Sequence, residues 1–195
     1  GCYAPHSSLT PELLAEIETK IMSKIREGFK QEKFDYRGVL YVGLMITPQG
    51  PKVVEFNCRF GDPETQVIMN QMASDLAQVI DDILNGKDPV IEMYTDRYTL
   101  GVVVAAEGYP EAPMKDIPLP DLDKENADCI VYAAGVKAGE QGLLSNGGRI
   151  LLIAGQGETL QAAQDKAYRY LSANPIAHTF YRSDIGAKAI RFTEK

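Results

Sequence analysis

The segment Gly38–Asn57 constrains the fold most, because it holds two β-type runs joined by a short turn. Gly38–Thr47 is rich in Val, Leu, Tyr and Ile, which favour strands. Pro48 and Gly50 fit positions i+1 and i+3 of a type I turn. The chain is therefore expected to reverse and return through Lys52–Asn57 as the second arm of an antiparallel hairpin.

Helical periodicity flanks this hairpin on both sides. Residues 10–30 repeat apolar side chains at helical spacing, and Thr10 is the expected N-cap. After the hairpin, Asp62-Pro63-Glu64 resembles a helix start. Ser74 is expected to cap a further helix that ends near residue 86.

The second half of the chain predicts a smaller sheet covered by a helix. Periodicity is lost over Lys87–Arg97, which predicts a domain boundary and hence domains 1–95 and 96–195. The prolines and acids of Gly108–Asp128 predict an exposed connection. We expect an α+β fold whose further elements are strands at Tyr98–Glu107, Cys129–Val136 and Arg149–Ala154, a turn at 146–148 and a helix at Glu158–Ala173.

Composition narrows the function classes. The 195 residues carry a net charge of -7, which disfavours nucleic acid as a partner. The apolar runs are far shorter than the ~20 residues that a membrane-spanning helix needs. Three cysteines without a CxxC motif indicate neither a disulfide framework nor a zinc site, and a cytoplasmic protein is expected. Because the first residue is Gly1 and not Met, we expect a processed product or a fragment.

Polar side chains on the second hairpin arm carry the chemistry. Since side chains alternate along a strand, Glu55 and Asn57 are expected on one face, with Arg59 beside them if the strand persists. A carboxylate and an amide oxygen at this spacing suit Mg²⁺, which completes its shell with water and substrate phosphates. Arg59 could then neutralise charge on a transferring phosphoryl group.

Each of these patterns also has a simpler interpretation. Glu55 and Asn57 could be ordinary polar residues on a solvent-exposed hairpin, and Asp62 could be a plain helix cap. Asn146-Gly147-Gly148-Arg149 predicts a turn, because Asn-Gly is a common hairpin signal, and a substrate contact there stays open.

Long motifs resemble the phosphoribosylamine-glycine ligase (glycinamide ribonucleotide synthetase) family of the ATP-grasp superfamily. The resemblance lies in Gly38–Met45 and in the run Glu55–Gln66, which reads EFNCRFGDPETQ. Shorter matches in the same order and spacing are Gly1–Pro5, Gly108–Pro110, Ser145–Arg149 and Tyr181–Gly186. Together they span essentially the whole chain.

The resemblance implies a fold and an activity. The fold is the C-terminal lobe of an ATP-grasp domain, an antiparallel sheet with helices, followed by a small sheet-and-helix C-terminal domain. The activity is the joining of glycine to 5-phosphoribosylamine with ATP as co-substrate, through a glycyl phosphate, in purine biosynthesis. The family's main nucleotide residues precede the part matched here, so the chain is expected to require that N-terminal half and to be inactive alone.

The resemblance also implies residue roles. Glu55 and Asn57 become ligands of Mg²⁺ or Mn²⁺, Arg59 a catalytic phosphate contact, and Asp62, Pro63, Glu64, Asn146 and Gly148 substrate-binding residues. The chain has Gly43 where many ATP-grasp enzymes place a further metal-binding carboxylate. Two rivals remain: another ATP-grasp carboxylate-amine ligase, and a non-catalytic phosphate-binding or docking module.

Overall fold

The computed structural model describes residues 1–6, 8–121 and 129–193, which form two compact units. We call the unit of Gly1–Pro5, Asp62–Met72 and Tyr94–Lys195 the sheet unit, and the unit of His6–Gly61 and Ala73–Met93 the hairpin unit. The chain passes between the two units more than once. The predicted domain boundary at residue 95 stays a prediction.

The hairpin unit is built on the predicted antiparallel pair. Strands β2 (Tyr41–Thr47) and β3 (Gly50–Asn57) pair from Tyr41 opposite Asn57 to Thr47 opposite Gly50. Gly50 closes the turn at a φ of 95°, a conformation that favours glycine. The register shifts between Gly43 and Leu44, so that β3 carries a bulge at Val54.

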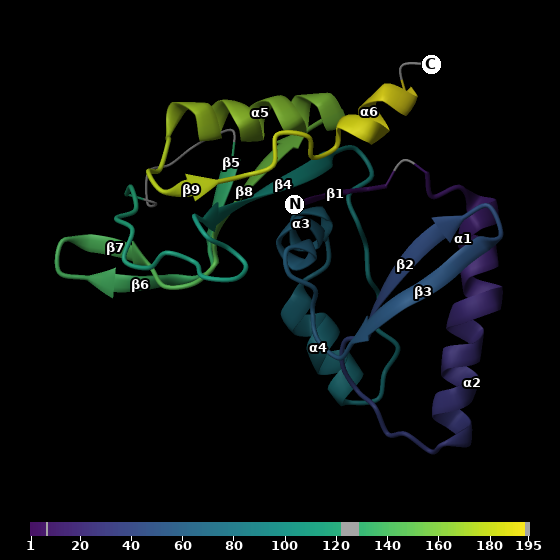
Figure 1. Ribbon diagram of the computed structural model, residues 1–195. Coiled ribbons are helices and arrows are strands. Elements are labelled where there is room, and N and C mark those ends of the chain that lie inside the picture. The colour runs from purple at the N-terminus through teal and green to yellow at the C-terminus, as the bar shows by residue number, and fades with distance from the viewer. Residues whose placement is uncertain (7, 122–128, 194–195) are drawn as a thin grey trace. The chain divides into compact units, whose positions relative to one another are not determined.

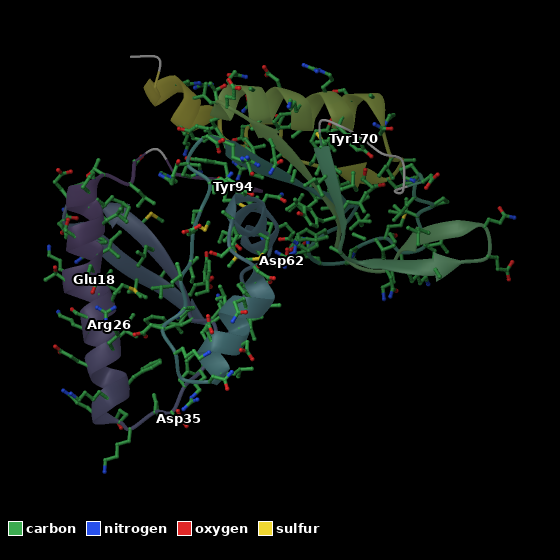
Figure 2. All side chains as sticks on the ribbon, turned by 180° about the vertical axis from the view of Figure 1, so that it is seen from behind. Glu18, Arg26, Asp35, Asp62, Tyr94 and Tyr170 are labelled. Carbon is green, nitrogen blue, oxygen red and sulfur yellow. The ribbon has the colours of Figure 1, made fainter. Side chains whose placement is uncertain are left out.

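The predicted helix of residues 10–30 is one helical segment with a π-helical turn inside it. It consists of α1 (Pro11–Ile17), the π-helix η1 (Glu18–Met22) and α2 (Ser23–Gln31). Thr10 caps it as predicted, because its hydroxyl accepts a hydrogen bond from the amide of Leu13 at 3.3 Å. Glu18 of η1 and Arg26 of α2 form an ion pair on the exposed surface of this segment (Figure 2).

The second helix of the hairpin unit, α4 (Leu76–Leu84), begins one residue later than predicted. Ser74 is not its cap: the Asp75 carboxylate accepts hydrogen bonds from the amides of Ala77 and Gln78. The Ser74 hydroxyl instead bonds backbone groups of Val90 and Glu92. Two adjacent residues could cap this helix, and the loop at residues 90–92 uses one of them.

The sheet unit is an antiparallel sheet in the order β1-β4-β8-β5, with β9 also paired to β4 (Figure 1). Its strands are β1 (Cys2–Ala4), β4 (Tyr98–Ala106), β5 (Cys129–Ala133), β8 (Arg149–Gly157) and β9 (Thr179–Phe180). The α+β fold class is thus confirmed. The core lies against one face of this sheet and includes Leu100, Val102, Leu151 and Ile153.

Two helices cover opposite faces of this sheet (Figure 1). Helix α5 (Leu160–Ala173) lies on the Gly155 side, where a Cβ would collide with Ala163. Helix α3 (Glu64–Gln71) lies on the Gly101 side, where a Cβ would come within 2.8 Å of Val67. Glycine at these two strand positions therefore lets each helix approach the sheet closely. The last helix is α6 (Ala187–Thr193).

Two predictions for the second half were wrong. An extra hairpin, β6 (Val136–Gly139) and β7 (Gly142–Ser145), separates β5 from β8, so residues 146–148 form a bend and not the turn between two long strands. These strands are short, and three of their eight residues are glycine or alanine, which are depleted in strands. Their sequence therefore shows no clear strand pattern.

The connection at 108–128 is not exposed throughout. Ile117 is buried, and its amide donates to the Ser145 hydroxyl at 3.0 Å. Residues 122–128 of that prediction lie outside the described residues. Among the helices described, none is long and apolar enough to cross a membrane.

Candidate functional site

The predicted metal ligands lie together on one strand of the hairpin unit. Glu55 and Asn57 are two residues apart on β3, and the Asn57 amide donates to Glu55 Oε1 at 3.0 Å. The Glu55 side chain is exposed and Asn57 is half-buried. The two side chains therefore share one face of the hairpin, as the alternation of strand side chains predicted.

Gly43 gives the Glu55 side chain its space. The two residues are cross-strand partners, and a Cβ at position 43 would lie 2.9 Å from Glu55 Cγ. A larger residue at this position would have to displace the Glu55 side chain. The absence of a side chain at Gly43 thus leaves room for the carboxylate side chain of Glu55.

This pair fits a Mg²⁺ or Mn²⁺ ion that is held mainly by phosphates. It supplies one carboxylate and one amide oxygen, since Asn57 turns its NH₂ group toward Glu55 and leaves its carbonyl oxygen to bind. Within residues 1–6, 8–121 and 129–193, no group of three or more His, Cys, Asp or Glu side chains could hold a metal. Such a pair therefore suits a cation that brings its remaining ligands with a nucleotide.

Arg59 does not follow from strand alternation. Strand β3 ends at Asn57, and the Arg59 guanidinium donates to the carbonyl of Phe60 at 2.8 Å. Its predicted place beside Glu55 and Asn57 depended on the strand continuing. Its role as a phosphate contact stays a prediction.

The residues of the Gly-Asp-Pro-Glu motif after the glycine belong to the sheet unit. Asp62 does not cap α3, whose N-cap residue is Pro63 and makes no side-chain capping bond. Asp62 instead forms an ion pair with Arg149, at 3.3 Å between Oδ2 and Nη2, and its carbonyl accepts from Arg149 Nη1 at 3.1 Å. Asp62 is therefore not a plain helix cap, and its role as a substrate-binding residue stays a prediction.

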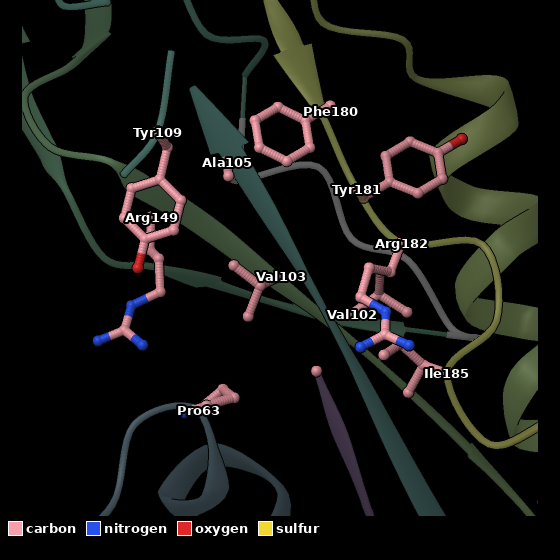
Figure 3. A pocket seen from close by; sticks show the side chains of 11 residues that line it. Pro63, Val102, Val103, Ala105, Tyr109, Arg149, Phe180, Tyr181, Arg182 and Ile185 are labelled. Carbon is pink, nitrogen blue, oxygen red and sulfur yellow. The ribbon is translucent and has the colours of Figure 1, made fainter. Parts of the chain in front are cut away.

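A cavity of about 250 Å³ opens beside this ion pair within the sheet unit (Figure 3). Its lining outside β4 includes residues of four motifs far apart in sequence: Pro63, Tyr109, Arg149, and the run Phe180-Tyr181-Arg182. Figure 3 shows the Arg149 and Arg182 side chains on opposite sides of Val103. Val102, Val103 and Ala105 of β4 form its apolar floor.

The two residues predicted at the 146–148 bend differ in their surroundings. Asn146 is exposed, and its backbone N–H donates to the carbonyl of Gly135 at 2.7 Å. Gly148 lies under the ring of Tyr109, where any side chain would collide with the ring. Gly148 thus makes room for a cavity wall, while a direct substrate contact at either residue stays a prediction.

Cys2, close to this cavity, is a poor nucleophile. Burial and the nearby Glu64 carboxylate raise the pKa of its thiol to about 12. The thiol donates weakly to the Pro63 carbonyl at 3.5 Å. Nucleophilic chemistry at this position is therefore disfavoured near neutral pH.

Comparison with known proteins identifies the family. Residues 1–65 match "Phosphoribosylglycinamide synthetase, ATP-grasp (A) domain", and residues 99–188 match "Phosphoribosylglycinamide synthetase, C domain". The chain belongs to the phosphoribosylglycinamide synthetase family. The matches leave only residues 66–98 and 189–195 unassigned, and the family resemblance of the sequence motifs is confirmed.

Curated relatives of this family are similar along nearly the whole chain. The phosphoribosylamine-glycine ligase of Streptococcus pyogenes serotype M1 is 48% identical over 193 residues, which are 98% of this chain and 45% of the relative. That of Halalkalibacterium halodurans is 42% identical over 190 residues, 97% of this chain and 44% of the relative. The chain thus spans about half the length of these relatives.

Solved structures agree on the fold. The crystal structure of phosphoribosylamine-glycine ligase from Thermotoga maritima superposes with a TM-score of 0.79 at 33% identity, over 94% of this chain and 45% of that one. A biotin carboxylase domain of a thermophilic 2-oxoglutarate carboxylase, described as bound to bicarbonate, gives a TM-score of 0.65 at 16% identity, covering 92% of this chain and 40% of that one. The second likeness concerns the fold alone.

Sequence reasoning missed the arginine cavity. Tyr109, Arg149 and Arg182 all lie within the motifs that carry the family resemblance, but no single motif brings them together. The available signal was two arginines in motifs otherwise made of glycine and turn residues. Only the antiparallel order of β4, β8 and β9 places them around one cavity.

Proposed function

We propose that the longer protein to which this chain corresponds joins glycine to 5-phosphoribosylamine, with conversion of ATP to ADP and phosphate, in de novo purine biosynthesis. The observation that carries the proposal is the Glu55–Asn57 pair on one face of β3, facing a glycine on the neighbouring strand. The likeness to curated ligases over 98% of the chain supports the choice of reaction.

Glu55 and Asn57 would hold Mg²⁺ or Mn²⁺ together with the phosphates of ATP. A divalent cation bound there supplies charge neutralisation for those phosphates. The residues' own task is to fix two oxygen donors on a paired strand, so that the nucleotide binds in one orientation. Arg59 would add positive charge toward the transferring phosphoryl group.

The proposed reaction has two steps. A carboxylate oxygen of glycine attacks the γ-phosphorus of ATP, ADP leaves, and glycyl phosphate forms. The amine nitrogen of phosphoribosylamine then attacks the glycyl carbonyl carbon, the C–O bond to phosphate breaks, and the nitrogen loses a proton. Asp62, Pro63, Glu64, Asn146 and Gly148 are the proposed substrate-binding residues.

Three further expectations belong to this proposal. The boundary between the two domains is expected near residue 95, and the separate matches at residues 1–65 and 99–188 support this. The main nucleotide-binding residues belong to the part of the relatives that this chain does not match, so the chain alone should form no product. A cytoplasmic location is expected, with no nucleic-acid or membrane partner.

The test is the substrate requirement of the full-length protein. We expect ADP release that needs both glycine and phosphoribosylamine, with glycinamide ribonucleotide as product. ADP release with a different carboxylic acid, and none with glycine, would establish the rival ATP-grasp ligase. Magnesium-dependent ADP binding that survives Glu55→Ala and Asn57→Ala together, without turnover of any acid, would instead favour a non-catalytic phosphate-binding or docking module.

A further inference from the structure

We propose that the cavity between Arg149 and Arg182 binds the phosphorylated pentose of the amine substrate, and that Tyr168 positions Arg182 for this contact. The proposal rests on the ligase function proposed above and deepens it. It concerns only the sheet unit, because every residue that lines the cavity belongs to that unit.

Arg182 is held as a phosphate ligand would need to be. Its Nε and Nη2 donate to the two oxygens of Asp184 at 2.9 and 2.8 Å, which fixes the plane of the guanidinium. The hydrogen bond from Arg182 lowers the pKa of Asp184, so that this carboxylate stays charged. The pairing with Asp184 uses Nε and Nη2 and does not involve Nη1.

Tyr168 and Gln164 fasten the segment that carries Arg182 to helix α5. The Tyr168 hydroxyl donates to the Arg182 carbonyl at 2.7 Å and accepts from the Ile185 amide at 3.1 Å. One helical turn earlier, the Gln164 amide donates to the Ile185 carbonyl at 2.7 Å. Because burial raises the pKa of Tyr168, its hydroxyl keeps the proton that it donates. The loop is thus tied to a helix that is anchored in the core.

The opposite wall is equally determined. Arg149 is oriented by Asp62 through two contacts, both made by its terminal Nη groups. The ring of Tyr109 lies against Gly148, which offers no side chain to displace it. Two guanidinium groups therefore flank an apolar floor, with aromatic rings above it (Figure 3).

The composition of the cavity indicates a small, polar-ended ligand. Its volume of about 250 Å³ lies just below the ~300–1,000 Å³ of sites for drug-sized molecules. Arginine binds phosphate through paired N–H groups, and an apolar floor with aromatic rings suits the face of a sugar. The Glu64 carboxylate acts on Gly1 and Cys2 next to Pro63, and it would attract an amine there. A pentose with a phosphate at one end and an amine at the other has this arrangement of charge.

Titration calorimetry with ribose 5-phosphate tests the subsite in the full-length protein. We expect binding, no binding of unphosphorylated ribose, and a Kd raised by about tenfold or more by Arg182→Gln and by Arg149→Gln. Arg182→Lys should recover part of the loss, because it keeps the charge without the planar fork. Arg169→Gln on the exposed side of α5 is the matched control and should leave the Kd unchanged.

Tyr168→Phe tests the positioning role, because it keeps the ring and removes the hydroxyl. In the full-length enzyme we expect KM for phosphoribosylamine to rise about threefold to tenfold, with KM for ATP and glycine unchanged. A lower melting temperature with unchanged KM values would reduce Tyr168 to a structural residue and overturn its positioning role.

The outcomes separate this inference from the proposed function. The subsite is overturned if no ribose 5-phosphate binding is detected at a ligand concentration of about 10 mM, where millimolar Kd values are still measurable. It is also overturned if both arginine variants bind as the unchanged protein does. Either result stands even if the full-length protein makes glycinamide ribonucleotide. Binding that depends on both arginines, in a protein whose full-length form does not use phosphoribosylamine, supports the subsite and contradicts the ligase assignment.

Discussion

The sheet unit and the hairpin unit differ in how much core each one owns. The sheet unit buries a continuous set of aliphatic side chains around β4, β8 and α5. In the described part of the hairpin unit, the buried aliphatic side chains are Ile21 and Val79, while Val54 and Val90 are 64% and 72% exposed. An antiparallel pair by itself is marginally stable in water.

The two candidate sites differ in the same way as the two units. The arginine cavity lies in the unit with its own core, so its geometry is set by residues of this chain. The Glu55–Asn57 pair lies on a hairpin whose apolar neighbours, such as Val54 and Phe56, are largely exposed. We therefore expect the core of the sheet unit to hold the first site more firmly than the hairpin holds the second.

The largest expected effect comes from a core substitution in the sheet unit. Ile150 is fully buried, so Ile150→Ala should lower the free energy of unfolding by about 2–5 kcal/mol. Ile46 in the hairpin unit is 47% exposed, and Ile46→Ala should cost well under ~1 kcal/mol. Urea denaturation measures both. Equal losses would mean that the two units do not differ in core strength.

Thiol labelling compares the two units directly. Cys58 of the hairpin unit is exposed, whereas Cys2 of the sheet unit is half-buried with a pKa near 12. At pH 9 we expect Cys58 to react about 10²-fold faster, because the thiolate is the reactive form. Mass spectrometry after a short pulse of iodoacetamide distinguishes the two, and comparable rates would contradict the burial described for Cys2.

The same thiol gives a pH dependence with a defined sign. The pKa of Cys2 is raised on folding from 9.0 to about 12, so the folded state holds this proton more tightly than the unfolded state. Its contribution to stability is full below pH 9 and is lost as the pH rises toward 12. Cys2→Ala should remove that part of the alkaline decline. Denaturation at about pH 8, below the window, and at about pH 10.5, within it, measures the difference.

A glycine in the cavity wall should matter more than its neighbour. In Gly148→Ala the new methyl group would collide with the Tyr109 ring, which predicts a loss of about 1–3 kcal/mol. In Gly147→Ala the nearest atom is the Gly135 Cα at 3.3 Å, so a smaller loss is expected. Thermal unfolding compares the pair. Equal melting temperatures would show that Tyr109 does not depend on Gly148.

The smallest effect should be a gain in the hairpin unit. Gly28 lies within α2, and a Cβ there would meet nothing within 4 Å. Gly28→Ala should therefore stabilise the helix by about 0.5–1 kcal/mol. Slower amide hydrogen exchange in residues 23–31, with unchanged exchange in β8, is the expected readout. Slower exchange in both would mean that the two units open together.

How far the sequence predicts this molecule depends on the range of the interactions. The hairpin, the Thr10 cap and the common face of Glu55 and Asn57 follow from local periodicity, and all three were predicted. The choice of Asp75 over Ser74 as a cap depends on a loop that approaches from residues 90–92. Such tertiary competition leaves no trace in local sequence.

The cavity shows the same limit for function. Arg149 begins β8 and Arg182 follows β9, and both strands pair with β4, so the strand order brings them to one place. Strand order follows from long-range packing and not from the spacing of motifs. The bulge at Val54 likewise shifts the hairpin register, and the bulged residue itself is a valine, which is typical of a regular strand.

The most direct test of this account is a Mn²⁺ titration of the full-length protein in the presence of ATP, followed by electron paramagnetic resonance. We expect Glu55→Ala combined with Asn57→Ala to weaken ATP-dependent Mn²⁺ binding and to lower product formation, each by about 10²-fold or more. Arg182→Gln, as the matched control, should leave Mn²⁺ binding intact. Undiminished Mn²⁺ binding and turnover in the double variant would contradict the assignment of this pair as the metal site.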